Sequence, residues 1–317
     1  MRFAETFFWK VSFSIRLLAV VVYRAAFLIL RHTVYRPREP LRIPVAIVGA
    51  FRAGGSGKTP FVGEFSRRLV AKNLRVAVLC HASAWDEFLL LRSECVGASV
   101  FKTRNRYGTA KKIERDFDVI LCDGGLEDTR FSRAEVFVLR GRERAKNVFD
   151  LIPLGKCVSL EKDHPEAKEV RCFRSAERKI PSAQANPEEH SFCVSFGIAN
   201  VKNGEGKVLE PGTECSVVTA IGDPDRFAKD VESFGCAVLR KVFLPDHFRG
   251  YAQILRAELR RGLPVVVTEK DAVRLEAVDR NNPNLFVALE SIVFDRALDA
   301  YLNALFGGAF KNPPSTL

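Results

Sequence analysis

The residue types best suited to chemistry gather in one glycine-rich segment. The sequence GGSGKT runs from Gly54 to Thr59 and follows an apolar stretch, Val45 to Val48. Glycines let successive backbone N–H groups converge on phosphate oxygens, a lysine reaches the β and γ phosphates, and a threonine hydroxyl is a ligand for Mg²⁺. The pattern predicts a loop that binds the polyphosphate of a nucleotide, although a plain glycine-rich turn remains an alternative.

The predicted nucleotide-binding loop extends slightly beyond the glycines. Arg52 stands where the strict pattern G-x-x-x-x-G-K-[ST] has glycine, so the loop is a variant. Apolar residues then recur at helical spacing from Phe61, which places the phosphates at a helix N-terminus. The residues assigned to nucleotide binding are Arg52, Ala53, Gly54, Gly55, Ser56, Gly57, Lys58 and Thr59.

Three further residues could take part in catalysis. Asp123 ends an apolar stretch, from which it could hold Mg²⁺ together with Thr59, or it could only begin an Asp-Gly turn. Asp86 precedes a leucine run and could instead cap a helix. His247 lies in a loop and could be ordinary polar surface. If two lobes close, Asp86 and His247 could remove the proton from an attacking hydroxyl.

The elements that must position these residues alternate between strand and helix. Apolar runs at 45–48, 75–80, 117–123 and 135–139 predict strands, and helical stretches separate them. Such alternation indicates an α/β fold with a P-loop NTPase-like parallel sheet. A second group, with strands at 216–222, 237–239 and 263–268 and a helix at 224–234, predicts a smaller α/β lobe.

These elements divide the chain into four predicted parts. Asn-Gly and Pro-Gly pairs suggest a hairpin-like hinge between the two lobes. The parts are an amphipathic membrane-surface helix at 1–34, a kinase domain at 35–190, the hinge at 191–215, and a smaller lobe with a terminal helix at 216–317.

The net charge of +11 is concentrated near the N-terminus, where residues 1–40 carry seven lysines or arginines against two glutamates. On a helical wheel, most charges of residues 2–31 share one arc, and the opposite side is apolar. This pattern predicts a helix in the plane of a membrane surface, with the basic arc on anionic headgroups. Packing on the protein's own core is the alternative, and nucleic acid is not an expected partner.

Taken together, these motifs resemble the tetraacyldisaccharide 4'-kinase family. The resemblance covers nearly the whole chain and rests on the basic N-terminus, the loop from Pro44 to Pro60, Asp86 with Glu87, and four more segments. Those segments are DGGL from Asp123, AIGDPDRF from Ala220, FLPDH ending at His247, and TEKDAV from Thr268. The family also lacks glycine at the position of Arg52.

The resemblance implies an ATP-dependent lipid kinase at the cytoplasmic face of the bacterial inner membrane, peripherally bound. Its substrate would be a tetraacyldisaccharide 1-phosphate, phosphorylated on the 4'-hydroxyl in lipid A biosynthesis. Lys58 and Thr59 would bind phosphate and Mg²⁺, Asp123 would assist the metal, and Asp86 with His247 would activate the sugar hydroxyl.

The chain also departs from the family pattern. It has Asp123-Gly-Gly-Leu-Glu-Asp128 where the family usually has Asp-Asp-Gly-Leu-Gln-His, and two further segments, at Cys80 to Ala84 and Gly155 to Ser159, differ. Glu127 and Asp128 keep negative charge and could shift the Mg²⁺ ligands. The altered motif leaves two rivals open, a weakened relative that acts as a nucleotide-dependent binding protein and a membrane-surface ATPase with a protein partner.

Overall fold

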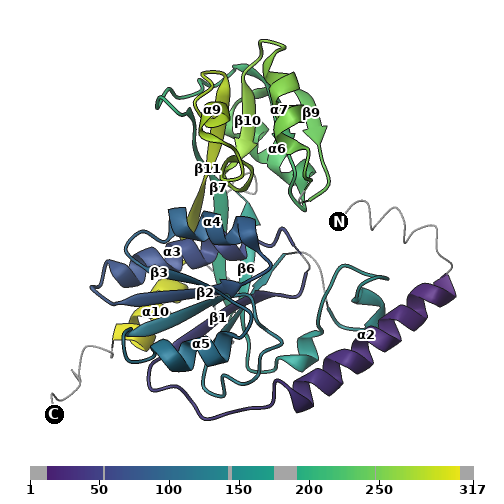
Figure 1. Ribbon diagram of the computed structural model, residues 1–317, viewed down its shortest axis with the longest axis vertical. Coiled ribbons are helices and arrows are strands. Elements are labelled where there is room, and N and C mark those ends of the chain that lie inside the picture. Colours follow the sequence, from purple (N-terminus) through teal and green to yellow (C-terminus); the bar gives the residue numbers. More distant parts are fainter. Residues whose placement is uncertain (1–12, 53, 142–144, 175–190, 247, 308–317) are drawn as a thin grey trace. The chain divides into compact units, whose positions relative to one another are not determined.

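The computed structural model in Figure 1 describes residues 13–52, 54–141, 145–174, 191–246 and 248–307. The chain divides into two compact units. The larger unit contains Phe13–Phe173, residues 191–194 and residues 293–307. The smaller unit contains Arg174 and Ser195–Ile292. The C-terminal helix, which the sequence grouped with the second lobe, thus belongs to the larger unit.

A parallel sheet forms the centre of the larger unit. Its strands follow the order β3-β2-β4-β1-β5-β6, and neighbouring strands in this order are parallel. Four of these strands were predicted, whereas β3 and β6 were not. The strands are β1 (Val45–Ala50), β2 (Val76–His81), β3 (Ser99–Thr103), β4 (Val119–Asp123), β5 (Glu135–Arg140) and β6 (Lys168–Arg174).

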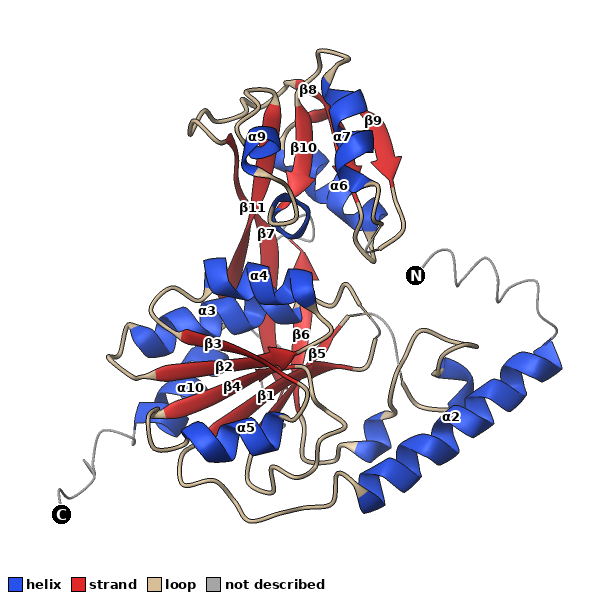
Figure 2. Ribbon diagram, viewed as in Figure 1, coloured by secondary structure: helices blue, strands red, loops and turns tan. Residues whose placement is uncertain are grey.

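Helices cover both faces of this sheet, which is why β1 and β4 are buried along their whole length. Figure 2 shows α3 and α4 on one face and α5 on the other. The helices of the larger unit are α2 (Phe13–Thr33), α3 (Lys58–Val70), α4 (Trp85–Glu94), α5 (Arg106–Ile113) and α10 (Arg296–Gly307), with two 3-10 turns, η1 (Val148–Asp150) and η2 (Glu161–Asp163).

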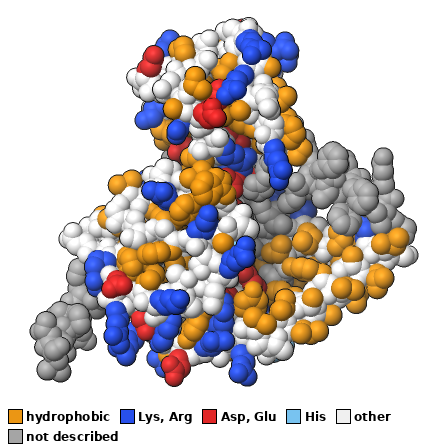
Figure 3. Space-filling view, in the orientation of Figure 1, with side chains coloured by type: hydrophobic (Ala, Val, Ile, Leu, Met, Phe, Trp, Pro, Cys, Tyr) orange, Lys and Arg blue, Asp and Glu red, His pale blue; other side chains and the backbone are white. Residues whose placement is uncertain are grey.

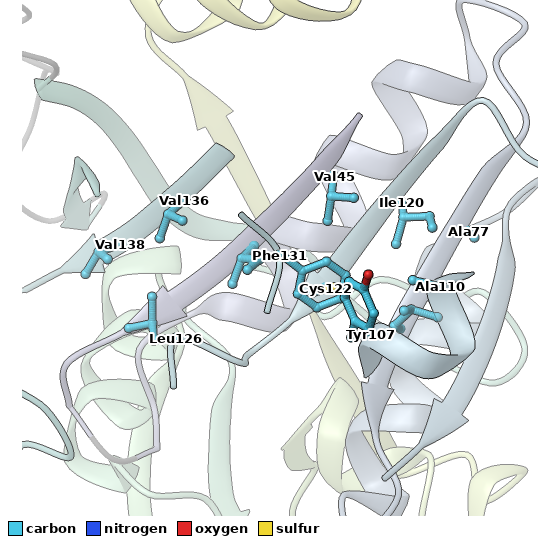
Figure 4. Packing of buried hydrophobic residues seen from close by; sticks show 12 residues of the cluster. Val45, Ala77, Tyr107, Ala110, Ile120, Cys122, Leu126, Phe131, Val136 and Val138 are labelled. Carbon is cyan, nitrogen blue, oxygen red and sulfur yellow. The ribbon is translucent and has the colours of Figure 1, made fainter. Parts of the chain in front are cut away.

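Alternating side chains of the strands build a core on each face. Under α5, Tyr107 and Ala110 pack with Ile120 and other buried residues of β1, β2, β4 and β5 (Figure 4). On the opposite face, the rings of Phe61 and Phe65 in α3 lie 6.3 and 5.9 Å from the ring of Phe137 in β5. These two cores hold the carboxyl ends of β1, β2 and β4 at one edge of the sheet.

The strands of the smaller unit follow the order β11-β10-β8-β9, and neighbouring strands in this order are parallel. Asp223 caps α6 by accepting a hydrogen bond from the Arg226 N–H, and Gly235 ends the helix at φ 114°. The predicted strands and the helix at 224–234 are therefore confirmed. The elements are β8 (Glu214–Thr219), α6 (Pro224–Phe234), β9 (Ala237–Phe243), α7 (Tyr251–Leu259), β10 (Val265–Thr268), α8 (Glu269–Ala272), α9 (Ala277–Arg280) and β11 (Leu285–Phe294).

The segment predicted as a hairpin-like hinge begins with one long strand, β7 (Ser191–Asn203). The turn that follows is tight, because the Asn203 N–H donates to the carbonyl of Lys207. The strands β7 and β11 each contribute residues to both units, because the division falls after Val194 in β7 and after Ile292 in β11.

Candidate active site

The glycine-rich segment forms the expected loop between β1 and α3. Gly54, Gly55 and Gly57 have φ values of 74°, 64° and 82°, a region that side chains disfavour. Gly57 is the N-cap of α3 and offers no side chain to its first N–H groups. Those donors remain available for an anion at the helix N-terminus. Ala53 lies outside the described residues, so its assignment stays a prediction.

Lys58 opens α3 beside the loop. Its Nζ lies 3.1 Å from the Ser56 hydroxyl oxygen, a weak contact that a phosphate oxygen could replace. Arg52 forms an antiparallel bridge with Cys157, which connects the start of the loop to the segment after η1.

Thr59 and Asp123 come together as the sequence predicted for a metal site. The Thr59 hydroxyl donates to Asp123 Oδ2 at 3.0 Å, and both side chains are buried. The strand register explains this contact, because β4 pairs with β1 so that Asp123 lies opposite Val48, shortly before the loop that leads to Thr59. Asp123 Oδ1 is buried and accepts no hydrogen bond from the described residues.

This donor set fits Mg²⁺. The ion takes oxygen ligands and is commonly held by one or two carboxylates, hydroxyls and waters together with substrate phosphates. Burial, assisted by the negative charge of Glu87, raises the pKa of Asp123 to about 6, while Lys58, the Thr59 hydrogen bond and Arg106 act in the opposite direction. A buried carboxylate with one unsatisfied oxygen is an unfavourable arrangement that a bound cation would relieve.

Asp86 lies in the first turn of α4, which follows β2. The N-cap residue of α4 is Ala84, which makes no side-chain cap hydrogen bond, so Asp86 is not the N-cap but one of two acidic residues in the first turn. Asp86 is 4% exposed. Since β2 pairs with β4 in parallel, Asp86 and Asp123 both follow the carboxyl ends of neighbouring strands.

His247 lies outside the described residues, and the pairing of Asp86 with His247 stays a prediction. Asp246, the residue before it, lies in the smaller unit. Its Oδ1 is 3.4 Å from Lys270 Nζ and 3.8 Å from Arg274 Nη2.

The altered motif after Asp123 places Arg106 beside the site. Arg106 Nη2 donates to the Asp123 carbonyl at 3.0 Å, and Nη1 lies 3.5 Å from Glu127 Oε1. Gly124 and Gly125 have φ values of 75° and 105°, and a Cβ on either would lie 3.3 Å from this guanidinium. The glycines therefore leave room for a buried arginine that sequence reasoning missed.

Asp128, whose charge could shift the Mg²⁺ ligands, is paired with a buried arginine. Arg130 donates to both of its carboxylate oxygens at 2.6 Å, from Nε to Oδ1 and from Nη2 to Oδ2. Arg130 Nη1 donates to Asn105 Oδ1 at 2.9 Å. The pair is buried on both sides, so Asp128 serves to neutralise Arg130.

The N-terminal helix α2 turns its basic side toward the protein. Arg24 forms a bidentate ion pair with Asp163 at 2.5 and 2.6 Å, and the Tyr23 hydroxyl donates to the Val158 carbonyl at 2.5 Å. Val20 is buried against Leu151 and neighbouring apolar residues of the same unit. For Arg24, the expected contact with headgroups is therefore wrong, because an internal carboxylate holds it.

The opposite side of α2 is apolar and exposed, as Figure 3 shows. Its exposed residues include Ile15, Leu18, Val22 and Ile29. Within the described residues, α2 is the one helix long and apolar enough to cross a membrane by length and composition. A contiguous exposed apolar face of this kind marks a contact with a membrane or a protein.

Comparison with known proteins identifies the family of the chain. Residues 12–82 and 80–306 match the family described as Tetraacyldisaccharide-1-P 4'-kinase. The chain belongs to this family. The resemblance stated from the motifs is thus confirmed, including its coverage of nearly the whole chain.

Individual relatives are similar at moderate identity. The tetraacyldisaccharide 4'-kinase of Pseudomonas aeruginosa strain LESB58 is 29% identical over 279 residues, which cover 80% of each chain. That of Neisseria meningitidis strain FAM18 is 29% identical over 268 residues, 75% of each. A crystal structure of LpxK from Aquifex aeolicus in complex with ATP matches 92% of this chain and 98% of its own, with a TM-score of 0.65 and 18% identity. That likeness confirms the predicted P-loop α/β fold.

Proposed function

We propose that the protein transfers the γ-phosphoryl group of ATP to the 4'-hydroxyl of a tetraacyldisaccharide 1-phosphate in lipid A biosynthesis. The observation that carries the proposal is the buried contact between Thr59 and Asp123 at the end of the glycine-rich loop, in a chain that belongs to this kinase family. The exposed apolar face of α2 supports a lipid substrate and a peripheral position at the cytoplasmic face of the inner membrane.

Each part of the site has a role in this reaction. The backbone of residues 54–58 and the Lys58 ammonium hold the β and γ phosphates of ATP. Thr59 and Asp123 would hold Mg²⁺, which when bound offsets phosphate charge. Arg106 keeps the end of β4 in place through the Asp123 carbonyl.

The chemical step needs a group that accepts one proton. Asp86, helped by His247, accepts the proton of the 4'-hydroxyl while the hydroxyl oxygen forms a bond to the γ phosphorus. The bond between that phosphorus and the β–γ bridging oxygen breaks, and the electron pair leaves with ADP. Catalysis then rests on positioning and on charge neutralisation.

The experiment is a transfer assay with purified protein in detergent, labelled ATP and a tetraacyldisaccharide 1-phosphate. The expected product is the bisphosphate, and Lys58→Ala should abolish it. Lys112→Ala, at an exposed lysine of α5, is the matched control and should keep wild-type activity. ATP binding without product would contradict the kinase proposal. It would favour a weakened relative that acts as a nucleotide-dependent binding protein, an alternative suggested by Gly124, which stands where the family has a second aspartate.

A second outcome would distinguish the membrane-surface ATPase from the kinase. If ATP hydrolysis ignores the glycolipid and rises with an added protein, the chain is a membrane-surface ATPase.

A further inference from the structure

An exposed aromatic residue lies directly beside Asp86 and has no part in the roles above. Trp85 opens α4 and is 56% exposed, whereas the next residue, Asp86, is 4% exposed. The first turn of this helix therefore presents an indole outward and a carboxylate inward. An exposed large aromatic next to a buried acid is typical of a binding surface.

Neighbouring side chains hold the indole in place. Lys102 Nζ, from β3, lies 4.5 Å from the centroid of the Trp85 ring and 5.4 Å from that of Phe88. The rings of Trp85 and Phe88 are 6.0 Å apart at their centroids. Cation–π and aromatic contacts of this kind fix the side chain before a ligand arrives. Such preorganisation reduces the entropy lost on binding.

The order of the strands places this surface on the acceptor side of the reaction. Starting from the glycine-rich loop after β1, the sheet edge passes Asp123 at the end of β4 and then Asp86 and Trp85 after β2. Neighbouring strands are about 4.8 Å apart, so β2 lies roughly 10 Å from β1 across the sheet. Trp85 shares its helical turn with the proposed base and not with the phosphate-binding loop.

We propose that Trp85 is a platform for the sugar ring that carries the acceptor hydroxyl. The apolar C–H face of the ring would pack against the indole, which directs the hydroxyl toward Asp86. Lys102 acts as a positioning residue that orients the indole. This inference rests on the proposed function, because the occupant is the sugar of the glycolipid.

Fluorescence tests the contact directly, because Trp9 and Trp85 are the two tryptophans of the chain. In a Trp9→Phe background, the tetraacyldisaccharide 1-phosphate in detergent micelles should shift the Trp85 emission to the blue and protect it from iodide quenching. Empty micelles and Mg·ATP should do neither. A shift with Mg·ATP but not with glycolipid would identify a platform for adenine and overturn the inference.

Kinetics give an independent readout. Trp85→Ala should raise the KM for glycolipid about fivefold, since a contact with an aromatic face contributes to binding beyond the area that it buries. The KM for ATP should not change, and Trp85→Phe should restore most of the loss. Leu239→Ala, at a residue of the same 56% exposure in β9, is the control and should alter neither constant.

The failures of this inference and of the proposed function differ. An unchanged glycolipid KM in an active Trp85→Ala enzyme would overturn the platform and leave the kinase intact. If the wild type makes no bisphosphate, the kinase proposal fails, and the fluorescence titration still decides whether the indole contacts the glycolipid.

Discussion

Replacing Asp128 with alanine tests whether this residue neutralises Arg130 or binds metal. Both partners are buried, with side-chain exposures of 3% for Asp128 and 9% for Arg130. The guanidinium donates two hydrogen bonds to Asp128 and one to Asn105. Removing one partner of a buried pair leaves an uncompensated charge, which typically costs 3–5 kcal/mol.

The structure favours the lower end of that range. Arg130 keeps its hydrogen bond to Asn105, and its Cζ lies 5.2 and 5.9 Å from the ring centroids of Tyr35 and Tyr107. We therefore expect Asp128→Ala to lower the free energy of unfolding by about 3 kcal/mol. At roughly 2–4 °C per kcal/mol, the melting temperature should fall by about 6–12 °C.

Thermal unfolding followed by near-UV circular dichroism measures this change, with two comparisons. Asp118→Ala breaks an arginine–aspartate pair of similar geometry whose side chains are 57% and 31% exposed, so the loss should be at most about 1 kcal/mol. The double variant Asp128→Ala/Arg130→Met removes the buried charge and should recover part of the stability.

The opposite pattern would refute this reasoning. If Asp128→Ala keeps the wild-type melting temperature but raises the Mg²⁺ concentration needed for activity, Asp128 acts on the metal and the ion pair is incidental.

Three further predictions concern the nucleotide site and the membrane helix. Because burial and Glu87 raise the pKa of Asp123 to about 6, Mg·ATP binding measured by calorimetry should weaken below that pH, and Asp123→Asn should bind weakly at every pH. The pKa of Asp123 is higher in the folded than in the unfolded protein. The stabilisation that this group gives the ligand-free protein is therefore present at pH 4 and is lost as the pH rises through 6. Chemical denaturation that shows the free energy of unfolding rising over this range would contradict the pKa shift. Gly55→Ala, at φ 64°, should cost about 1 kcal/mol of backbone strain and weaken ATP affinity; unchanged affinity would mean that the loop adapts. Val22→Asp, on the exposed face of α2, should reduce co-sedimentation with phospholipid vesicles at least tenfold, whereas Thr33→Asp at the end of the helix should not; equal binding would exclude this face as the contact.

The sequence predicted the parts of the fold that carry unambiguous local signals. Buried strands such as β1 and β4 read as apolar runs, and α6 carries a capping aspartate and a terminal glycine, so its bounds agree with the prediction. Strands with mixed composition were missed. In β6, KEVRCFR mixes charged and apolar residues without a strict alternation, which a short window does not separate from a loop.

The candidate site was predictable where its geometry follows from strand order. Thr59 and Asp123 meet because β1 and β4 are parallel neighbours, a frequent arrangement for a loop of this type. Arg106 was not predictable, since its contact with the Asp123 carbonyl needs the actual position of α5. Asp128 and Arg130 are only two residues apart in the sequence, so an ion pair between them could have been guessed. The sequence does not show that the pair is buried, because burial depends on the whole fold.

The orientation of α2, with Arg24 toward the protein and an apolar side exposed, determines how this helix can bind a membrane. An arginine paired with an internal aspartate is not available to anionic lipids, so burial of the apolar face must supply most of the binding by α2. Electrostatic attachment to headgroups weakens as salt screens it within a Debye length, but burial of apolar surface does not. Attachment through α2 should therefore resist a high-salt wash and yield to detergent. Its calorimetric signature should be a negative heat-capacity change.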